Sequence, residues 1–256
     1  MTLIDTHAHI YYDDFTGRMD DIIRASANNG VEKIISIGVD LKSSEKCIKL
    51  AEKYESVFAT CGIHPHEADK TPKGYLYELE QFYEHQKVVA VGEIGLDYHY
   101  DFSDRKTQRK IYNEQLEMAN SLDIPAVVHC RQSDDDILGG IQESDHSYGV
   151  IHCFSSGLDF AAKILETGFH LSFTGMITFV KELEEVVREV SLSKMMVETD
   201  SPYLSPKPHR GKQNEPANVL YVAEKIAELK EISLEEVAES TTRTALQLFK
   251  KITDSN

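Results

Sequence analysis

Eight short apolar runs, rich in Ile, Val and Phe, recur along the chain and constrain its fold more than any other feature. Their nearly continuous hydrophobicity is typical of parallel strands that are buried on both faces. Successive runs start at least about 20 residues apart, which leaves room for a crossover helix each time. We interpret as strands the runs at residues 3–5, 33–37, 57–61, 88–91, 126–128, 149–151, 170–173 and 195–197.

Several intervals between these runs carry the apolar period of an amphipathic helix, for example at Met19, Ile22, Ile23 and Ala27. Eight strand–helix units predict an α/β fold, and a closed sheet of such units is a TIM (β/α)8 barrel, here expected to be distorted. An open, doubly wound sheet of eight strands is the alternative, and periodicity alone does not separate the two.

Helical patterns continue after the eighth run, at residues 219–229 and 234–249, so we expect C-terminal helices beyond the barrel units. Ser233, with Glu236 three residues later, forms a capping-box pattern at the start of the second one. Barrels of this kind commonly run to about 250 residues as one domain. No repeat, low-complexity tract or linker interrupts the chain, which predicts a single domain over residues 1–256.

The charge balance and the cysteines narrow the class of protein. A net charge of −16 argues against tight, non-specific binding to nucleic acid, because that affinity comes largely from Lys and Arg. It does not exclude a phosphate-bearing substrate, since bound metal ions present positive charge locally. No signal-peptide pattern and no run of about 18 apolar residues is found, and the four cysteines form no CxxC pair. We therefore expect a cytoplasmic protein with reduced thiols and no membrane partner.

Polar residues that could bind a metal ion stand where two of the runs end. His7 and His9 lie two apart, so a strand would place both rings on one face as a chelating pair, although two surface imidazoles are the alternative. Glu93 follows the fourth run and could bridge two cations, or be an exposed strand end. The flanking Gly92 and Gly95 allow a close approach of the backbone there.

Three more runs end in a histidine or a carboxylate: the fifth at His129, the sixth at His152 and the eighth at Asp200. Asp200 could bind a metal ion, orient the attacking water and accept its proton. Glu198 could support it from deeper in the barrel or be a buried structural acid.

Cys130 and Cys153 directly follow the histidines of the fifth and sixth runs. Neighbouring residues of a strand face opposite sides, so we expect both thiols to point away from the ligands as small packing residues. Ligation of zinc by a thiolate is the less favoured alternative.

The ends of five runs thus carry candidate ligands, and a barrel brings such ends to one mouth, whereas an open sheet spreads them along an edge. The pattern therefore favours the barrel. The predicted metal ligands are His7, His9, Glu93, His129, His152 and Asp200.

Several residues could surround such a centre. His64 could contact a phosphate or protonate a leaving group, although it and His66 could also be loop histidines without a catalytic role. Arg131, and Arg210 in the basic loop at residues 205–216, could hold a phosphate. Aromatic residues near the expected mouth could stack on bases or pack in the core and rim; they are Tyr98, Tyr100, Phe154 and Tyr203.

Taken in order, these segments resemble the TatD family of metal-dependent deoxyribonucleases, within the amidohydrolase-like barrel superfamily, over essentially the whole chain. The resemblance is carried by residues 4–9, 62–66, 92–98, 125–131, 152–157 and 198–204. It implies two divalent ions, one held by His7, His9, Glu93 and Asp200 and the other by Glu93, His129 and His152. It also implies cleavage of DNA phosphodiesters, often from the 3′ end of single strands and supported by magnesium.

What the resemblance implies for the mechanism is that Asp200 accepts a proton while His64, Arg131 and Arg210 hold the phosphate. Imidazole ligands suit Zn²⁺, Mn²⁺ or Ni²⁺ better than Mg²⁺, so the bound metal stays open. One alternative is a hydrolase of another ester, such as a D-aminoacyl-tRNA deacylase, and a second is a non-catalytic metal-binding protein, against which the intact Asp200 counts. DNA is the expected partner, and no obligate protein partner is predicted.

Overall fold

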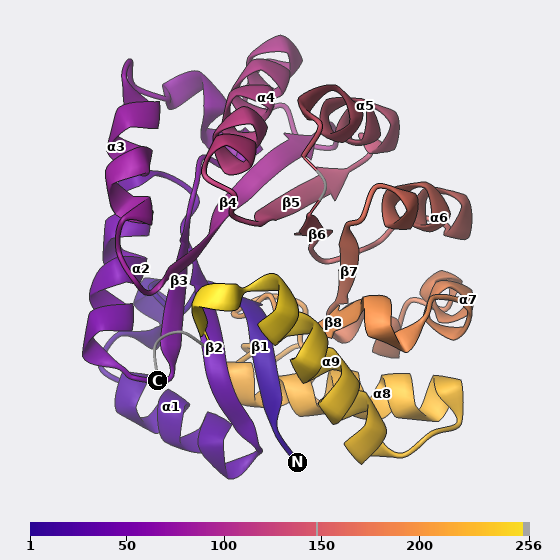
Figure 1. Cartoon of the computed structure of the whole chain (residues 1–256). Coiled ribbons are helices and arrows are strands. Elements are labelled where there is room, and N and C mark those ends of the chain that lie inside the picture. Colours follow the sequence, from indigo (N-terminus) through magenta and orange to yellow (C-terminus); the bar gives the residue numbers. More distant parts are fainter. Residues whose placement is uncertain (147, 253–256) are drawn as a thin grey trace.

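The computed structural model describes residues 1–146 and 148–252, and eight parallel strands pair in chain order from β1 to β8. The strands surround a common axis with helices on the outside, so the predicted TIM barrel is confirmed (Figure 1). The strands are β1 (Leu3–Ala8), β2 (Val31–Ile37), β3 (Val57–Cys61), β4 (Val88–Asp97), β5 (Ala126–Arg131), β6 (Gly149–Ile151), β7 (His170–Phe173) and β8 (Met195–Val197).

The barrel closes between β8 and β1 through the chain that follows β8. An isolated parallel bridge joins Ala8 to Ser201, and the backbone N–H of His9 donates to the carbonyl of Ser201 at 2.8 Å. The backbone N–H of Asp200 likewise donates to the carbonyl of His7 at 2.9 Å. Register shifts in the β1–β2, β3–β4 and β4–β5 ladders account for the expected distortion.

Helices connect the strands and cover the outside of the barrel (Figure 1). Both predicted C-terminal helices are present, and the capping box of Ser233 and Glu236 forms at the start of the second. The α-helices of the described residues are α1 (Met19–Asn28), α2 (Leu41–Lys53), α3 (Tyr75–Tyr83), α4 (Arg105–Ser121), α5 (Asp134–Ser144), α6 (Leu158–Glu166), α7 (Glu182–Glu189), α8 (Val219–Lys230) and α9 (Leu234–Leu248).

The last turn of α9 and the residues just after it close the amino-terminal mouth of the barrel. Leu248, Phe249 and Ile252 form one apolar cluster with strand residues such as Ile4 and Phe58. In Figure 1, α9 accordingly lies against β1 and β8. The opposite mouth, at the carboxyl ends of the strands, is therefore the one that is available for a site.

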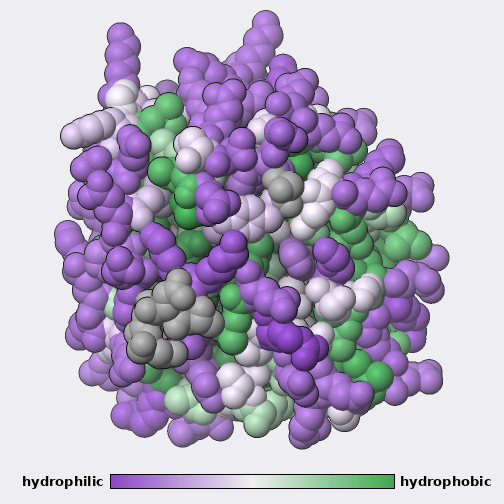
Figure 2. All heavy atoms as spheres, viewed as in Figure 1, coloured by the Kyte–Doolittle hydropathy of each residue, from purple (hydrophilic) through white to green (hydrophobic). Residues whose placement is uncertain are grey.

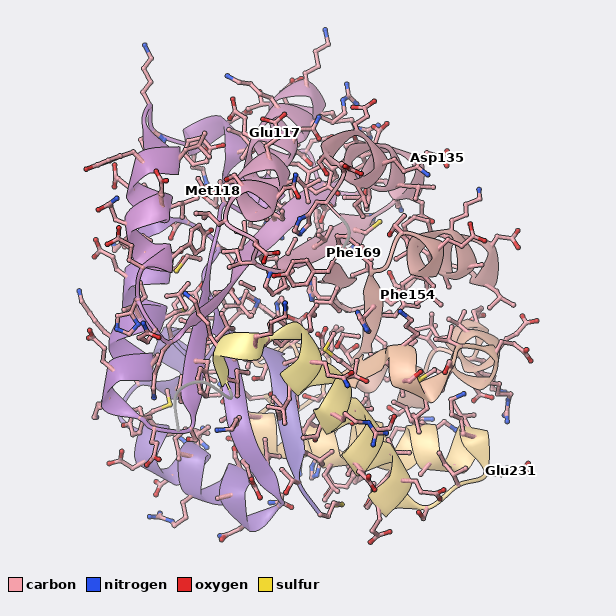
Figure 3. The ribbon with its side chains drawn as sticks, viewed as in Figure 1. Glu117, Met118, Asp135, Phe154, Phe169 and Glu231 are labelled. Atoms are coloured by element: carbon pink, nitrogen blue, oxygen red, sulfur yellow. The ribbon has the colours of Figure 1, made fainter. Side chains whose placement is uncertain are left out.

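A larger apolar cluster fills the layer between the strands and the outer helices. Phe154 and Phe169 lie inside the fold, whereas Glu117, Asp135 and Glu231 lie at its periphery and are exposed (Figure 3). Met118, next to Glu117 on α4, is half-buried. Hydrophilic residues cover most of the face seen in Figure 2. Among the described residues, no helix is both long and apolar enough to cross a membrane.

One strand extends well beyond its predicted end. The run 88–91 continues as β4 to Asp97, so Glu93 lies within a strand and not just after one. The glycines permit this, because a Cβ at Gly92 would lie 2.6 Å from the Cβ of Val127. Gly95, with φ 134°, passes so close to the backbone of His129 that a side chain there would clash. The close contact between β4 and β5 therefore requires the two glycines.

Candidate metal centre

All six predicted ligands meet at the open mouth of the barrel. They are His7 in β1, His9 just after it, Glu93 in β4, His129 in β5, His152 after β6 and Asp200 after β8. Donor atoms of these six residues and of His64 form groups of three whose members lie within 4.8 Å of one another, namely His7, Glu93 and His152; His7, His9 and Asp200; and His64, Glu93 and His129. The structure thus brings together residues that are up to 193 positions apart.

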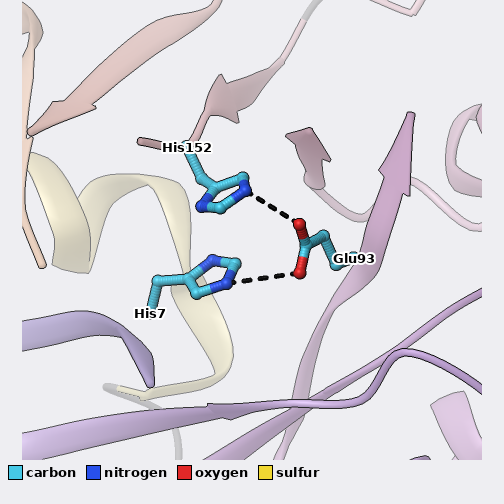
Figure 4. A group of neighbouring side chains, drawn as sticks. All are labelled: His7, Glu93 and His152. Carbon is cyan, nitrogen blue, oxygen red and sulfur yellow. Dashed lines mark ion pairs between the residues drawn. The ribbon is translucent and has the colours of Figure 1, made fainter. Parts of the chain in front are cut away.

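Glu93 occupies the middle of the centre and is almost completely buried. Its Oε1 lies 2.8 Å from Nε2 of His152 and 3.0 Å from Nδ1 of His129. Its Oε2 lies 3.4 Å from Nε2 of His7, so the two oxygens face different histidines (Figure 4). Oδ1 of Asp200 lies 3.8 Å from the same nitrogen of His7 and 3.4 Å from Nε2 of His9. The Glu93 carboxylate, whose two oxygens face different histidines, can in this position contact two neighbouring cations at once.

Hydrogen bonds on the outer nitrogens orient three of the imidazoles toward the centre. Nδ1 of His9 lies 3.2 Å from the carbonyl of Ile37, which can only accept, so this nitrogen carries the proton. Nε2 of His129 faces Asp97 at 3.2 Å. Nδ1 of His152 faces Glu198 at 3.3 Å, so this carboxylate supports His152 and not Asp200, the residue that it was expected to support. Each ring then presents its unprotonated nitrogen to the centre, as in metal sites with a carboxylate behind the histidine.

His64 differs from these three, although its Nε2 lies 3.3 Å from Oε1 of Glu93. Its Nδ1 accepts the backbone N–H of His66 at 3.1 Å, so the proton of the neutral ring is on Nε2. Burial lowers the pKa of His64 to about 4, which keeps the ring neutral near pH 7. His64 therefore presents an N–H donor to the centre and not a lone pair, which favours contact with an oxygen over contact with a metal ion.

The electrostatics of the centre favour bound cations. Burial would raise the pKa of Glu93 and Asp200, but the surrounding imidazoles outweigh burial and lower both. Burial would lower the pKa of His9, His129 and His152, yet neighbouring carboxylates raise all three. The carboxylates thus attract positive charge, and a divalent ion among the same atoms would supply it in place of protons. The donor set fits divalent metal ions.

The centre lies in a cavity of about 730 Å³. Arg131, at the end of β5, lines this cavity and stacks on Tyr100, with its guanidinium 4.8 Å from the ring centroid. Arg210 is not among the residues that line it and stacks instead on Phe179, at 3.8 Å. The structure therefore brings Arg131 to the centre and leaves Arg210 exposed in the loop at residues 205–216, after β8.

Two carboxylates behind the ligands were not assigned a role from the sequence. Oδ2 of Asp97 accepts from Nε2 of His66 at 2.9 Å as well as facing His129, and these hydrogen bonds outweigh burial and hold its pKa well below the usual range. Asp5 accepts the backbone N–H of Thr199 at 2.9 Å and its hydroxyl at 2.6 Å, which ties β1 to the chain after β8. Both acids lie inside the segments that carry the family resemblance, which was the available signal.

The prediction for the cysteines was wrong in part. Both cysteines are among the residues that line the metal cavity: Cys130 is buried, with Sγ 3.6 Å from the hydroxyl of Ser133, and Cys153 is half-buried. Cys153 lies after the end of β6 with φ 46°, so the alternation of a strand does not fix its direction. Among the described residues, neither thiol belongs to a group that could hold a metal ion.

Comparison with known proteins gives a consistent result. The family model of the TatD-related DNases matches residues 4–250. YabD of Bacillus subtilis, named as an uncharacterized metal-dependent hydrolase, is 36% identical over 97% of this chain and 99% of its own. YcfH of Escherichia coli K12, named in the same way, is 34% identical over 97% of this chain and 96% of its own. The crystal structure of YjjV, a TatD homolog from Escherichia coli K12, superposes with a TM-score of 0.92 at 30% identity and covers 97% of this chain and 98% of that one.

Proposed function

The chain belongs to the TatD-related DNase family of metal-dependent hydrolases, and from this premise we propose that it is a divalent-metal-dependent deoxyribonuclease. Its substrate would be DNA. It would act as a 3′–5′ exonuclease on single-stranded ends, in DNA repair or turnover. The observation that carries the proposal is the position of Glu93, whose two carboxylate oxygens face different histidines in a buried centre. That arrangement suits two neighbouring cations, and many enzymes that catalyse an in-line displacement at phosphorus use such a two-metal site.

The proposed ligand sets follow the two sides of Glu93. One ion would be held by His7, His9, Glu93 and Asp200. The second ion would be held by Glu93, His129 and His152. Two bound ions would activate a water molecule and stabilise the leaving oxygen. Mg²⁺ or Mn²⁺ would support activity, while the imidazole nitrogens also suit Zn²⁺ or Ni²⁺.

The roles of the protein's own groups follow from their positions. Asp200, at the rim of the centre, would accept the proton of the attacking water. The N–H of His64 would donate to a phosphate oxygen, because this imidazole stays neutral and its other nitrogen is occupied. Arg131 would steady the developing charge from the cavity wall. Arg210 would act as a phosphate contact only for a substrate that extends beyond the cavity.

The setting proposed for this activity is the cytoplasm, where a reducing environment suits four free cysteines. We also propose that residues 1–256 act as one domain and need no obligate protein partner.

The test is the degradation of single-stranded DNA, labelled at the 3′ or the 5′ end, by purified protein with EDTA, Mg²⁺ or Mn²⁺. Stepwise loss from the 3′ end with Mg²⁺ or Mn²⁺, abolished by EDTA and by Asp200→Asn, is the expected result. The absence of metal-dependent cleavage by protein that has been shown to bind the metals would refute the nuclease. In that case the same preparation would be assayed on D-aminoacyl-tRNA and small esters.

A further inference from the structure

The metal cavity gathers exposed aromatic side chains. Among the described residues, the large hydrophobic side chains that are exposed are Met1, Tyr77, Tyr100, Phe102 and Tyr203. Three of these, Tyr100, Phe102 and Tyr203, line the metal cavity. Exposed apolar rings at the mouth of a polar site commonly mark a surface that binds a partner or ligand.

Together with Tyr12, which also lines the cavity, these rings form two groups. One group lies where β1 and β8 end. Tyr12 and Tyr203, the β1/β8 aromatic pair, have ring centroids 6.1 Å apart. Tyr12 also stacks on the candidate ligand His9, at 5.3 Å between centroids and 12° between planes. Tyr203 follows Asp200 by three residues and is 53% exposed. This pair therefore adjoins the His9 and Asp200 side of the centre.

The second group lies across the barrel, in the loop after β4. Tyr100 and Phe102, the β4 aromatic pair, have centroids 5.3 Å apart, and Phe102 is 61% exposed. Both rings contact His66, which shares Asp97 with His129. In the ring order of the strands, β4 stands opposite β8. The two aromatic pairs thus flank the centre at opposite ends of its cavity.

The charges of the cavity indicate what such rings would bind. Arg131 is the only lysine or arginine among the described residues that line it, and the chain as a whole is strongly acidic. A nucleic acid strand bound here gains little from release of phosphate counterions, which usually dominates such affinity. Proteins that bind single strands supplement charge by stacking successive bases on aromatic rings. The aromatic pairs offer that contact on each side of the centre.

We propose that the β1/β8 aromatic pair and the β4 aromatic pair are stacking subsites for the two nucleobases on either side of the scissile phosphodiester. The inference rests on the proposed nuclease function and deepens it, because it names the residues that would bind the bases of the substrate. Two bases that stack on rings at opposite ends of a cavity are separated from each other and from any complementary strand. The substrate is therefore an unpaired strand, and every base is accepted because each has a π face.

The experiment measures KM and kcat of the metal-loaded protein on two single-stranded oligonucleotides. One carries normal bases, and the other has tetrahydrofuran abasic residues at the two positions that flank the bond to be cut. The variants are Tyr203→Leu and Phe102→Leu, with Tyr203→Phe as the conservative rescue. Tyr77→Leu is the matched control, because Tyr77 is 69% exposed on α3 and is not among the residues that line the cavity.

Removal of the bases should raise KM of the wild type about tenfold or more, the usual range for lost stacking. Tyr203→Leu and Phe102→Leu should each raise KM for the normal strand about tenfold and leave KM for the abasic strand within about twofold. Tyr203→Phe and Tyr77→Leu should behave like the wild type. A readout on the abasic strand separates stacking from a general effect on the site.

If the wild type cuts DNA in a metal-dependent manner but Tyr203→Leu and Phe102→Leu leave KM for the normal strand within about twofold, the stacking subsites are refuted and the nuclease stands. A variant that raises KM equally for both strands also refutes them, because its effect is then independent of the bases. A wild type without metal-dependent cleavage refutes the nuclease and the subsites together.

Discussion

Replacement of Asp97 by asparagine tests whether a carboxylate behind the ligands fixes the geometry of the metal centre. Asp97 is buried, and its Oδ2 accepts from Nε2 of His66 at 2.9 Å and faces Nε2 of His129 at 3.2 Å. Its Oδ1 accepts the backbone N–H groups of His99 and Tyr100, at 2.9 and 3.1 Å. All four of these neighbours are donors, so the residue must be an acceptor at both oxygens.

Asparagine has nearly the same shape but only one acceptor atom. In either orientation its NH₂ group faces two N–H donors, so at least one hydrogen bond to a charged carboxylate is lost; such bonds contribute about 1.5–3 kcal/mol. In the orientation that turns the NH₂ group toward the histidines, the ring of His129 loses the partner that directs its Nδ1 toward Glu93, at 3.0 Å; in the other orientation, the backbone N–H groups of His99 and Tyr100 lose their acceptor. If the loss falls on the metal-bound state, affinity for the metal drops by a factor of about 10 to 100.

Competition with a fluorescent chelator would measure the affinity of each protein for Mn²⁺ and Zn²⁺. Asp136→Asn is the matched control, because Asp136 accepts from Tyr98 and Arg109 but is not among the residues that line the metal cavity. We expect the control to bind within about twofold of the wild type. If Asp97→Asn bound both metals as tightly as the wild type, the positioning role of Asp97 would be disproved.

Three further predictions concern the centre and the fold. Glu93→Ala should reduce metal-dependent cleavage by more than about 100-fold while the far-UV circular dichroism stays unchanged, because it removes the carboxylate between the two ligand sets; a wild-type rate in nuclease-free protein would rule out the two-metal centre. Cys153→Ala should leave kcat/KM within about twofold, since its Sγ contacts Thr174 and Met176 and no ligand group; a large loss would mean that the thiol takes part. Ser233→Ala should lower the free energy of unfolding by about 1 kcal/mol in urea titration, because the capping box of α9 is lost, with no change in activity; an unchanged midpoint would contradict this.

The strands could be predicted because parallel strands covered on both faces leave apolar runs in the sequence. The predictions ended early where the strand enters the site. β1 continues through His7, and β4 continues through Glu93 to Asp97, since ligands and the glycines beside them interrupt the apolar pattern without ending the strand. The chemistry of the site therefore concealed the true length of the strands that carry it.

The six ligands could be proposed from their places at strand ends, and the structure gathers all of them. Their supporting contacts could not be proposed. The hydrogen bond of His66 to Asp97 joins the loop after β3 to the end of β4, and the one from Thr199 to Asp5 spans 194 positions. Such pairs depend on how the ends of different strands are placed in space, which no local pattern in the sequence records. Cys153 escaped prediction for a local reason, because its backbone leaves the strand conformation.

The apolar cluster of Leu248, Phe249 and Ile252 determines by which mouth a substrate can enter the barrel and a product can leave it. Together with the strand residues of the same cluster, these side chains block the barrel axis at the end opposite the metal centre. A polymer therefore cannot pass along the axis and leave at the far side. A substrate that reaches Glu93 enters past the β1/β8 and β4 aromatic pairs, and every product leaves by the same opening. Successive rounds on one polymer would then require each released fragment to clear the entrance before the chain advances.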